Sequence, residues 1–195
     1  EISRCDWSSD VCSSDLTLVV ACCDSRVDPA ILLHCKPGDL FVIRNVAALV
    51  PAVTQASNPC SVMSAIEYGV KHLNVEHIVV MGHSHCGGIH GLMTPESIAG
   101  ETYIQDWVSI ASPALERLQA MTGDEDEKTR SRHCEEGAVL ISLDNLLSYP
   151  WIAERVKNGQ LKLHALYYDL SEGNLYRFSP DSEDFELLFH TIENP

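Results

Sequence analysis

The sequence contains no long hydrophobic run and few basic residues. Its longest apolar segments, such as 77–81, are only as long as a β-strand, so we expect no membrane-spanning segment. Thirteen Lys and Arg stand against 28 Asp and Glu, a formal net charge of −15, and the basic residues form no cluster. A surface for nucleic acid or anionic lipid needs clustered positive charge, so we expect neither partner. The acidic balance itself indicates only solubility.

The eight cysteines do not form the regularly spaced pairs of a small disulfide-stabilised protein. The chain has 195 residues, of which 45% are hydrophobic, and this is enough for one domain with a substantial core. In such a chain, reduced thiols that in part bind metal are more typical than a disulfide framework. We therefore predict a cytoplasmic protein with some cysteines as metal ligands.

Residues 1–16 differ from the rest of the chain. They show no apolar periodicity, and they lack the basic start and apolar run of a signal peptide. The segment 6–16, DWSSDVCSSDL, resembles the translation of a sequencing-library adapter. We expect residues 1–16 to be non-native or disordered, the natural N-terminus with any targeting segment to be missing, and residues 17–195 to form a single domain. Cys5 and Cys12 are therefore excluded as ligands.

Strand-like and helix-like patterns alternate along most of the remaining chain. Short apolar runs indicate buried strands, and apolar residues repeated every three or four positions indicate amphipathic helices. This alternation predicts an α/β domain with a mainly parallel β-sheet flanked by helices, and a C-terminal hairpin adds antiparallel edge strands. We expect strands at 16–21, 39–44, 75–81, 160–169, 175–178 and 185–189, and helices at 29–34, 58–73, 104–118 and 135–147.

The helix expected at 58–73 has two faces that are not fully polar. One apolar stripe is suited to its own sheet, and a second, half-polar stripe is suited to a partner subunit. The first stripe consists of Val62, Ile66, Val70 and Leu73, and the second of Ala65, Tyr68 and His72.

Chemically reactive side chains follow two of the expected strands. Cys22, Asp24 and Arg26 come after the first strand, and His83 and Cys86 come after the third. Because ligands gather at the carboxyl ends of parallel strands, we expect these side chains to meet at one edge of the sheet. Two thiolates and an imidazole form a ligand set for Zn²⁺ that leaves the fourth tetrahedral position for water or for Asp24. Arg26 could hold that carboxylate in an ion pair and so decide between the two.

Other interpretations of these residues stay open at this point. The cysteines could be small core residues, because free Cys packs as a small hydrophobe. His83 could be an ordinary buried histidine, and a zinc site could be closed and purely structural. A phosphatase loop of the Cys-x₅-Arg type does not fit, because Arg26 is only four residues beyond Cys22. An Asp-Ser-Arg segment is costly to place at a buried strand end, which favours a functional site.

With their surroundings, these residues resemble the β-class carbonic anhydrases over 16–188. The resemblance implies a four-stranded parallel sheet with added edge strands, a homodimer or homotetramer, and one Zn²⁺ per chain at the subunit interface. The motifs that carry it are Cys22-x-Asp24-Ser25-Arg26, 38–45 (GDLFVIRN), Ile66-Glu67-Tyr68, Gly82-His83-x-x-Cys86-Gly87-Gly88, 107–111 (WVSIA) and Tyr167-Tyr168-Asp169.

The resemblance also implies roles for individual residues. The implied zinc ligands are Cys22, His83 and Cys86. Asp24 either takes the fourth position or accepts a hydrogen bond from zinc-bound water, and Arg26 holds it off the metal in the active state. The residues implied to line a narrow apolar CO₂ pocket are Phe41, Tyr68 and Gly87.

The implied reaction is the zinc-dependent, reversible hydration of CO₂ to bicarbonate and a proton. Zn²⁺ lowers the pKa of bound water from about 15.7 toward 7, and the zinc-bound hydroxide attacks CO₂. Two alternatives are a zinc hydrolase of carbonyl sulfide or carbon disulfide on the same scaffold, and a non-catalytic oligomeric protein stabilised by zinc. The pairing of Asp24 with Arg26 favours an enzyme, because a structural site needs no displaceable fourth ligand.

The sequence also departs from the family pattern. No glutamine precedes the first strand, where the family has one that hydrogen-bonds to substrate, and the N-terminal helices that wrap the partner subunit are not recognisable. In place of the Trp-x-Gly of bicarbonate-gated members stands 19–21 (VVA), so we predict no allosteric bicarbonate site.

Overall fold

The computed structural model describes residues 16–56, 60–121, 123 and 126–190. The expectation of a non-native N-terminal segment therefore falls, apart from Leu16, outside the described residues. So does the expected helix start at Asn58 and Pro59. The boundaries of a single domain over 17–195 stay a prediction.

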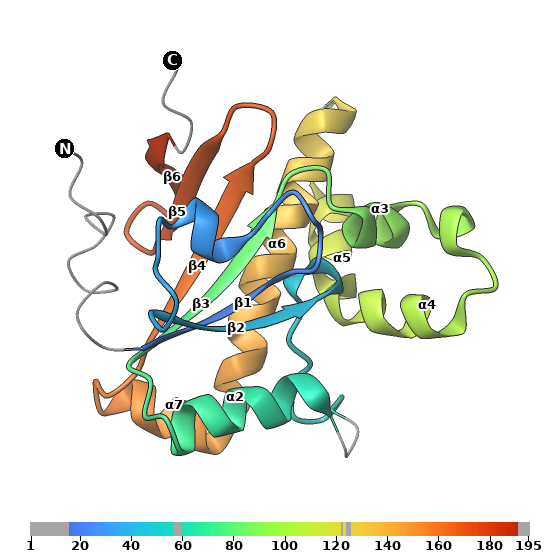
Figure 1. Ribbon diagram of the computed structural model, residues 1–195. Coiled ribbons are helices and arrows are strands. Elements are labelled where there is room, and N and C mark those ends of the chain that lie inside the picture. The colour runs from blue at the N-terminus through green and yellow to red at the C-terminus, as the bar shows by residue number, and fades with distance from the viewer. Residues whose placement is uncertain (1–15, 57–59, 122, 124–125, 191–195) are drawn as a thin grey trace.

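Six strands form one mixed sheet in the order β2-β1-β3-β4-β5-β6 (Figure 1). The first four strands in that order are parallel, and β5 and β6 continue the sheet antiparallel. The prediction of an α/β fold with a mainly parallel sheet and antiparallel edge strands is thus confirmed. The strands are β1 (Thr17–Cys22), β2 (Leu40–Asn45), β3 (His77–His83), β4 (Lys162–Asp169), β5 (Asn174–Ser179) and β6 (Asp184–His190).

Seven α-helices and three 3₁₀ turns are described around this sheet. The α-helices are α1 (Pro29–Leu32), α2 (Ser61–Lys71), α3 (Gly87–Met93), α4 (Thr102–Val108), α5 (Ser112–Ala120), α6 (Glu127–Leu147) and α7 (Pro150–Lys157). The 3₁₀ turns are η1 (Val46–Ala48), η2 (Pro95–Ile98) and η3 (Ser109–Ala111). Among the described helices, none combines the length and the apolar character needed to cross a membrane.

The helices differ from the sequence prediction in three ways. The single helix expected at 104–118 is divided into α4, η3 and α5, because Pro113 has no N–H to donate to the carbonyl four residues earlier and is accommodated in the first turn of α5. Helix α6 begins eight residues earlier than predicted, where the Asp126 carboxylate caps it by accepting a hydrogen bond from the Thr129 N–H at 2.7 Å. Helices α3 and α7 were not predicted, although Pro150 at the first position of α7 is a helix-start signal.

The core has two parts because alternate residues of a strand point to opposite faces of the sheet. Leu18 and Val20 of β1 pack with α2 and α7 on one face, and Val19 and Ala21 pack with α1 and α3 on the other. Helix α6 contributes to both parts, and in Figure 1 it runs behind the sheet. The central strands β1 and β3 are fully buried, which gives the residues at their ends a rigid support.

The two faces of α2 are only partly as expected. Val62, Ile66 and Val70 are buried against the sheet, but Leu73 follows the end of the helix and is 36% exposed. On the other face, Tyr68 is 51% exposed and its ring stacks on that of His72 at 5.1 Å. In the single chain this second face is therefore open to solvent.

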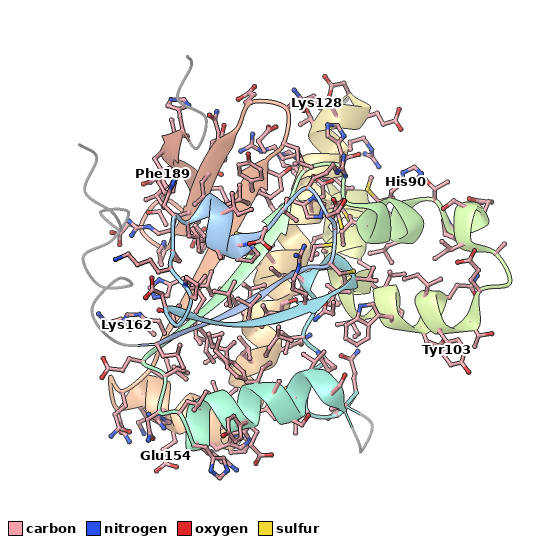
Figure 2. All side chains as sticks on the ribbon, in the orientation of Figure 1. His90, Tyr103, Lys128, Glu154, Lys162 and Phe189 are labelled. Carbon is pink, nitrogen blue, oxygen red and sulfur yellow. The ribbon has the colours of Figure 1, made fainter. Side chains whose placement is uncertain are left out.

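Helix α4 projects from the body of the protein together with α3 (Figure 1). Its Tyr103 is 93% exposed and points away from the sheet (Figure 2).

Two adjacent leucines of α6 provide a direct test of the packing. Leu146 is fully buried, whereas Leu147 is 43% exposed. Leu146→Ala is expected to lower the free energy of unfolding by about 2–5 kcal/mol, because it leaves a cavity among close-packed side chains. Leu147→Ala on the same helix should cost less than about 1 kcal/mol. Denaturant unfolding of both variants measures the difference, and equal losses would contradict this packing.

Candidate metal centre

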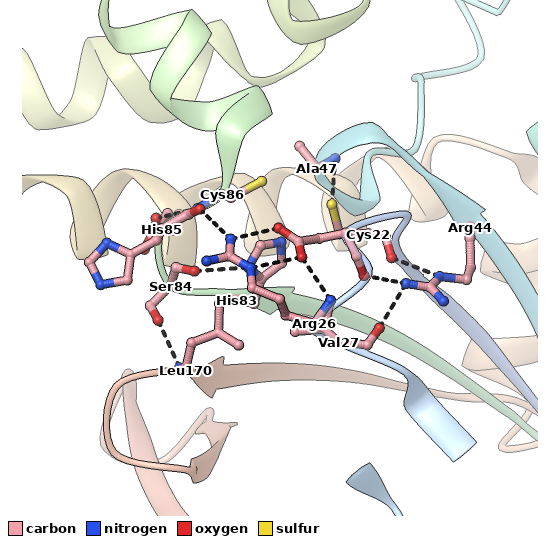
Figure 3. Close-up of polar contacts among 12 residues, drawn as sticks. Cys22, Arg26, Val27, Arg44, Ala47, His83, Ser84, His85, Cys86 and Leu170 are labelled. Carbon is pink, nitrogen blue, oxygen red and sulfur yellow. Dashed lines mark hydrogen bonds and ion pairs between the residues drawn. The ribbon is translucent and has the colours of Figure 1, made fainter. Parts of the chain in front are cut away.

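Cys22, His83 and Cys86 meet at the carboxyl end of the parallel sheet. Their ligand atoms all lie within 4.8 Å of one another, and all three residues are buried. Strands β1 and β3 are adjacent and parallel, with Ala21 opposite Met81, so their last residues arrive side by side. Cys86 follows three residues later, just before α3. The expected meeting of these three side chains is thus present, and Figure 3 shows the segment that carries His83 and Cys86, here called the metal-ligand loop (residues 83–86).

The protonation pattern of His83 suits a metal. Its Nδ1 hydrogen-bonds to the backbone carbonyl of Ser84 at 2.9 Å, so Nδ1 carries the proton and Nε2 keeps its lone pair. Within the described part of the chain, this buried Nε2 has no hydrogen-bond partner. Leaving a buried polar atom without a partner is costly. An ion bound between the imidazole and the two thiols would remove that cost, so the residues fit a Zn²⁺ ion.

Cys22 is placed in surroundings that favour its thiolate. The Cys86 thiol donates toward it, which lowers the pKa of Cys22, and the backbone N–H of Ala47 points at its sulfur at 3.4 Å. The same interaction raises the pKa of Cys86. Ala47 and Ala48 hold left-handed backbone conformations with φ of 63° and 55°, which are strained for alanine. One thiolate is therefore ready before a metal binds.

This difference predicts how the metal-free protein titrates. Burial raises the pKa of Cys35 and Cys134 to about 11, so these thiols stay protonated at neutral pH. Because the pKa of Cys22 is lowered, its thiolate should persist at pH values well below the roughly 8.5 of free cysteine. Ultraviolet thiolate absorbance of the metal-stripped chain should show about one thiolate at pH 7 that Cys22→Ser removes. Identical titrations of the two proteins would contradict the assignment.

Asp24 lies beside this cluster but is held by Arg26. The Arg26 guanidinium donates to both carboxylate oxygens, at 2.9 Å from Nε and 2.7 Å from a terminal nitrogen, and the Arg26 backbone N–H donates at 2.9 Å. These contacts hold the pKa of the Asp24 carboxyl well below its usual range. The guanidinium also donates to the His85 carbonyl at 3.2 Å, which ties the pair to the metal-ligand loop (Figure 3).

Arg44 is a site residue to which the sequence analysis gave no role. From β2, its guanidinium donates to the carbonyl oxygens of Cys22, Asp24 and Val27, at 2.9, 2.5 and 2.9 Å. It therefore fixes the backbone on both sides of Asp24 (Figure 3). A possible signal was its position in the neighbouring strand, one residue before the level of Cys22.

The three expected pocket residues lie in different places. Gly87 adjoins Cys86 and lines a cavity of about 510 Å³ between the starts of α3 and α6. Phe41 pairs with Leu18, four residues before Cys22, which corresponds to roughly 13 Å along the strand. The ring of Tyr68 lies 6.3 Å from that of Phe41. A single chain therefore does not bring Phe41 and Tyr68 to the metal-ligand cluster.

Comparison with known proteins shows the family. A sequence profile described as carbonic anhydrase matches residues 17–175. "Beta carbonic anhydrase 5, chloroplastic" of Arabidopsis thaliana is 41% identical over 165 residues, which cover 84% of this chain and 54% of that protein. The chain belongs to the β-class carbonic anhydrase family. It spans about half to three-fifths of the length of the curated relatives that it matches.

Solved structures of β-class carbonic anhydrases have the same fold. The structure of the β-carbonic anhydrase CcaA superposes with a TM-score of 0.83 at 30% identity, covering 88% of this chain and 82% of that one. A tetrameric β-carbonic anhydrase from Sordaria macrospora gives a TM-score of 0.70 at 31% identity, covering 86% and 82%. Relatives of this β-class chain include proteins named chloroplastic and mitochondrial, so its cytoplasmic location stays a prediction.

Proposed function

We propose that this chain binds one Zn²⁺ through Cys22, His83 and Cys86 and catalyses the reversible hydration of CO₂ to bicarbonate and a proton. The observation that carries the proposal is the buried Nε2 of His83, which has no partner in the described part of the chain and lies in a cluster with two sulfurs. Family membership supports the same reaction. A structural zinc site would not explain the carboxylate that Arg26 holds beside the cluster.

The metal ligands, Asp24 and Arg26 would each have a separate role in the proposed reaction. The three buried donors would hold the metal and leave one tetrahedral position for a reactant. Bound Zn²⁺ would supply Lewis acidity that lowers the pKa of water and makes a nucleophile near neutral pH. Asp24, kept ionised and oriented by Arg26, would accept a hydrogen bond from the attacking water. That hydrogen bond would orient the water so that a lone pair of its oxygen faces CO₂.

A second copy of the chain is part of the proposal. Phe41 lies too far along β2 to line the pocket of its own chain, and the ring of Tyr68 lies beside Phe41. Tyr68 is half exposed on the open face of α2. In a homodimer or tetramer, the partner subunit would supply these rings to the CO₂ pocket, beside Gly87. Light scattering after size-exclusion chromatography measures the assembly.

Stopped-flow CO₂ hydration of the full chain, with its zinc content measured, tests the proposal. We expect one zinc per chain and activity that rises from roughly pH 6.5 to 9, as the nucleophile becomes deprotonated. Stoichiometric zinc with hydrolysis of carbonyl sulfide but no CO₂ hydration would replace the reaction by the alternative on the same scaffold. Stoichiometric zinc without either turnover would indicate a non-catalytic protein. A lack of zinc would overturn the site itself.

A further inference from the structure

Glu135 is a buried carboxylate that reaches the metal-ligand loop from another part of the fold. It lies in α6 and is only 5% exposed. Its Oε1 accepts a hydrogen bond from the backbone N–H of Cys86 at 3.1 Å. Its Oε2 accepts one from the Tyr167 hydroxyl at 2.7 Å. Both carboxylate oxygens are therefore used, and one of their two partners is a residue of the candidate metal centre.

The metal-ligand loop depends on support from other elements. His85 has a left-handed φ of 56°, which is strained for a residue other than glycine. The Ser84 hydroxyl accepts a hydrogen bond from the Leu170 N–H at 2.8 Å and anchors the first half of the loop. At the other end of the loop, the carboxylate of Glu135 accepts the hydrogen bond from the Cys86 N–H. This contact fixes the backbone from which the Cys86 sulfur projects.

Tyr167 in turn holds the carboxylate in place. The Tyr167 side chain is 1% exposed, and the Arg132 guanidinium lies 5.3 Å from its ring centre. Burial raises the pKa of Tyr167, so its hydroxyl stays protonated and donates to Glu135. Arg132 and Tyr167 both line the 510 Å³ cavity, with His90 and Lys128 among its other lining residues, both labelled in Figure 2. Glu135 and Cys86 line the same cavity, so these contacts all lie along its wall.

We propose that Glu135 is a positioning residue for the candidate zinc site, which orients Cys86 through its backbone N–H and is itself oriented by Tyr167. The inference rests on the zinc site of the proposed function. Removing the carboxylate would leave the Cys86 N–H and the Tyr167 hydroxyl buried without partners, and the loop would move to satisfy them. Groups that orient a metal ligand typically account for about 10–100-fold in metal affinity.

The experiment compares three variants of the full chain. The zinc dissociation constant is measured by competition with a chelator, and the visible spectrum of the Co²⁺-substituted protein reports the thiolate–metal geometry. For Glu135→Ala we expect the dissociation constant to rise about 10–100-fold and the thiolate–cobalt band to change. Glu135→Gln should stay within about threefold of wild type, because its amide oxygen can accept from the Cys86 N–H and its NH₂ group can donate to the Tyr167 hydroxyl, which can also accept. The matched control is Glu136→Ala, the next residue of α6, which is 9% exposed and pairs with Arg132.

Each outcome decides the inference. A folded Glu135→Ala protein with unchanged zinc affinity and spectrum would overturn it, and so would an equal loss in Glu136→Ala. If circular dichroism shows that Glu135→Ala does not fold, Tyr167→Phe replaces it, with an expected several-fold rise in the dissociation constant and an altered spectrum. Unchanged values for Tyr167→Phe would then overturn the inference. A wild-type chain that binds no zinc would overturn the proposed function as well, which separates the two failures.

Discussion

His83→Ala should abolish zinc binding and CO₂ hydration together. The substitution removes one of three buried donors and leaves two thiols, whereas a catalytic zinc site needs three protein ligands. We expect the zinc content to fall from one per chain to below about one tenth, and the hydration rate to fall to that of buffer, because the source of the nucleophile is gone. Elemental analysis and stopped-flow hydration on the same preparation measure both quantities.

The control for this prediction is His90→Ala. His90 lies in α3, four residues after Cys86, and its side chain is exposed. The His90→Ala variant should keep one zinc per chain and nearly the full CO₂ hydration activity. Zinc retained at one equivalent in His83→Ala would contradict the ligand assignment.

Asp24→Asn should separate zinc binding from turnover. The ligand atoms of Cys22, His83 and Cys86 are untouched, so we expect one zinc per chain. Asparagine cannot accept hydrogen bonds at both positions that Arg26 addresses, and its amide donates where the carboxylate accepts. We expect kcat/KM for CO₂ hydration to fall about 10²–10³-fold, the range for loss of a positioned proton acceptor.

Arg26→Ala completes this test. It releases a carboxylate that is held by two side-chain hydrogen bonds, so Asp24 becomes free to compete for the fourth position on the metal. Zinc should stay bound while the CO₂ hydration activity falls. The double variant Asp24→Asn/Arg26→Ala should have the same kcat/KM as Asp24→Asn, because the two residues act as one unit. Wild-type turnover in Asp24→Asn would remove Asp24 from the mechanism.

The position of the cluster was predictable because it depends on topology. Cys22 and His83 end adjacent parallel strands, and parallel strands present their carboxyl ends at one edge. Most strand boundaries also follow the prediction within one or two residues, since buried apolar runs are unambiguous in this chain. The spacing of His83 and Cys86 then places the third ligand without further information.

The contacts around the cluster were not predictable in the same way. Glu135 reaches Cys86 only because of how α6 crosses β3, and helix packing of this kind leaves no local sequence signal. The left-handed backbone at Ala47 is also invisible in the sequence, because alanine rarely adopts it. The division of the helix predicted at 104–118 depends on Pro113, and whether a proline bends a helix or ends it depends on the surrounding packing.

The three hydrogen bonds of Arg44 have a mechanical consequence. Arg44 belongs to β2, which is the outermost strand on its side of the sheet. Its guanidinium donates hydrogen bonds to the backbone on both sides of Asp24. A small slide of this edge strand would disturb all three bonds at once, and with them the backbone that carries Cys22 and Asp24. The position of β2 is therefore coupled, through Arg44, to the backbone of the metal-ligand cluster. A partner that packs against β2 would therefore restrict the movement of the backbone at Cys22 and Asp24 without touching either residue.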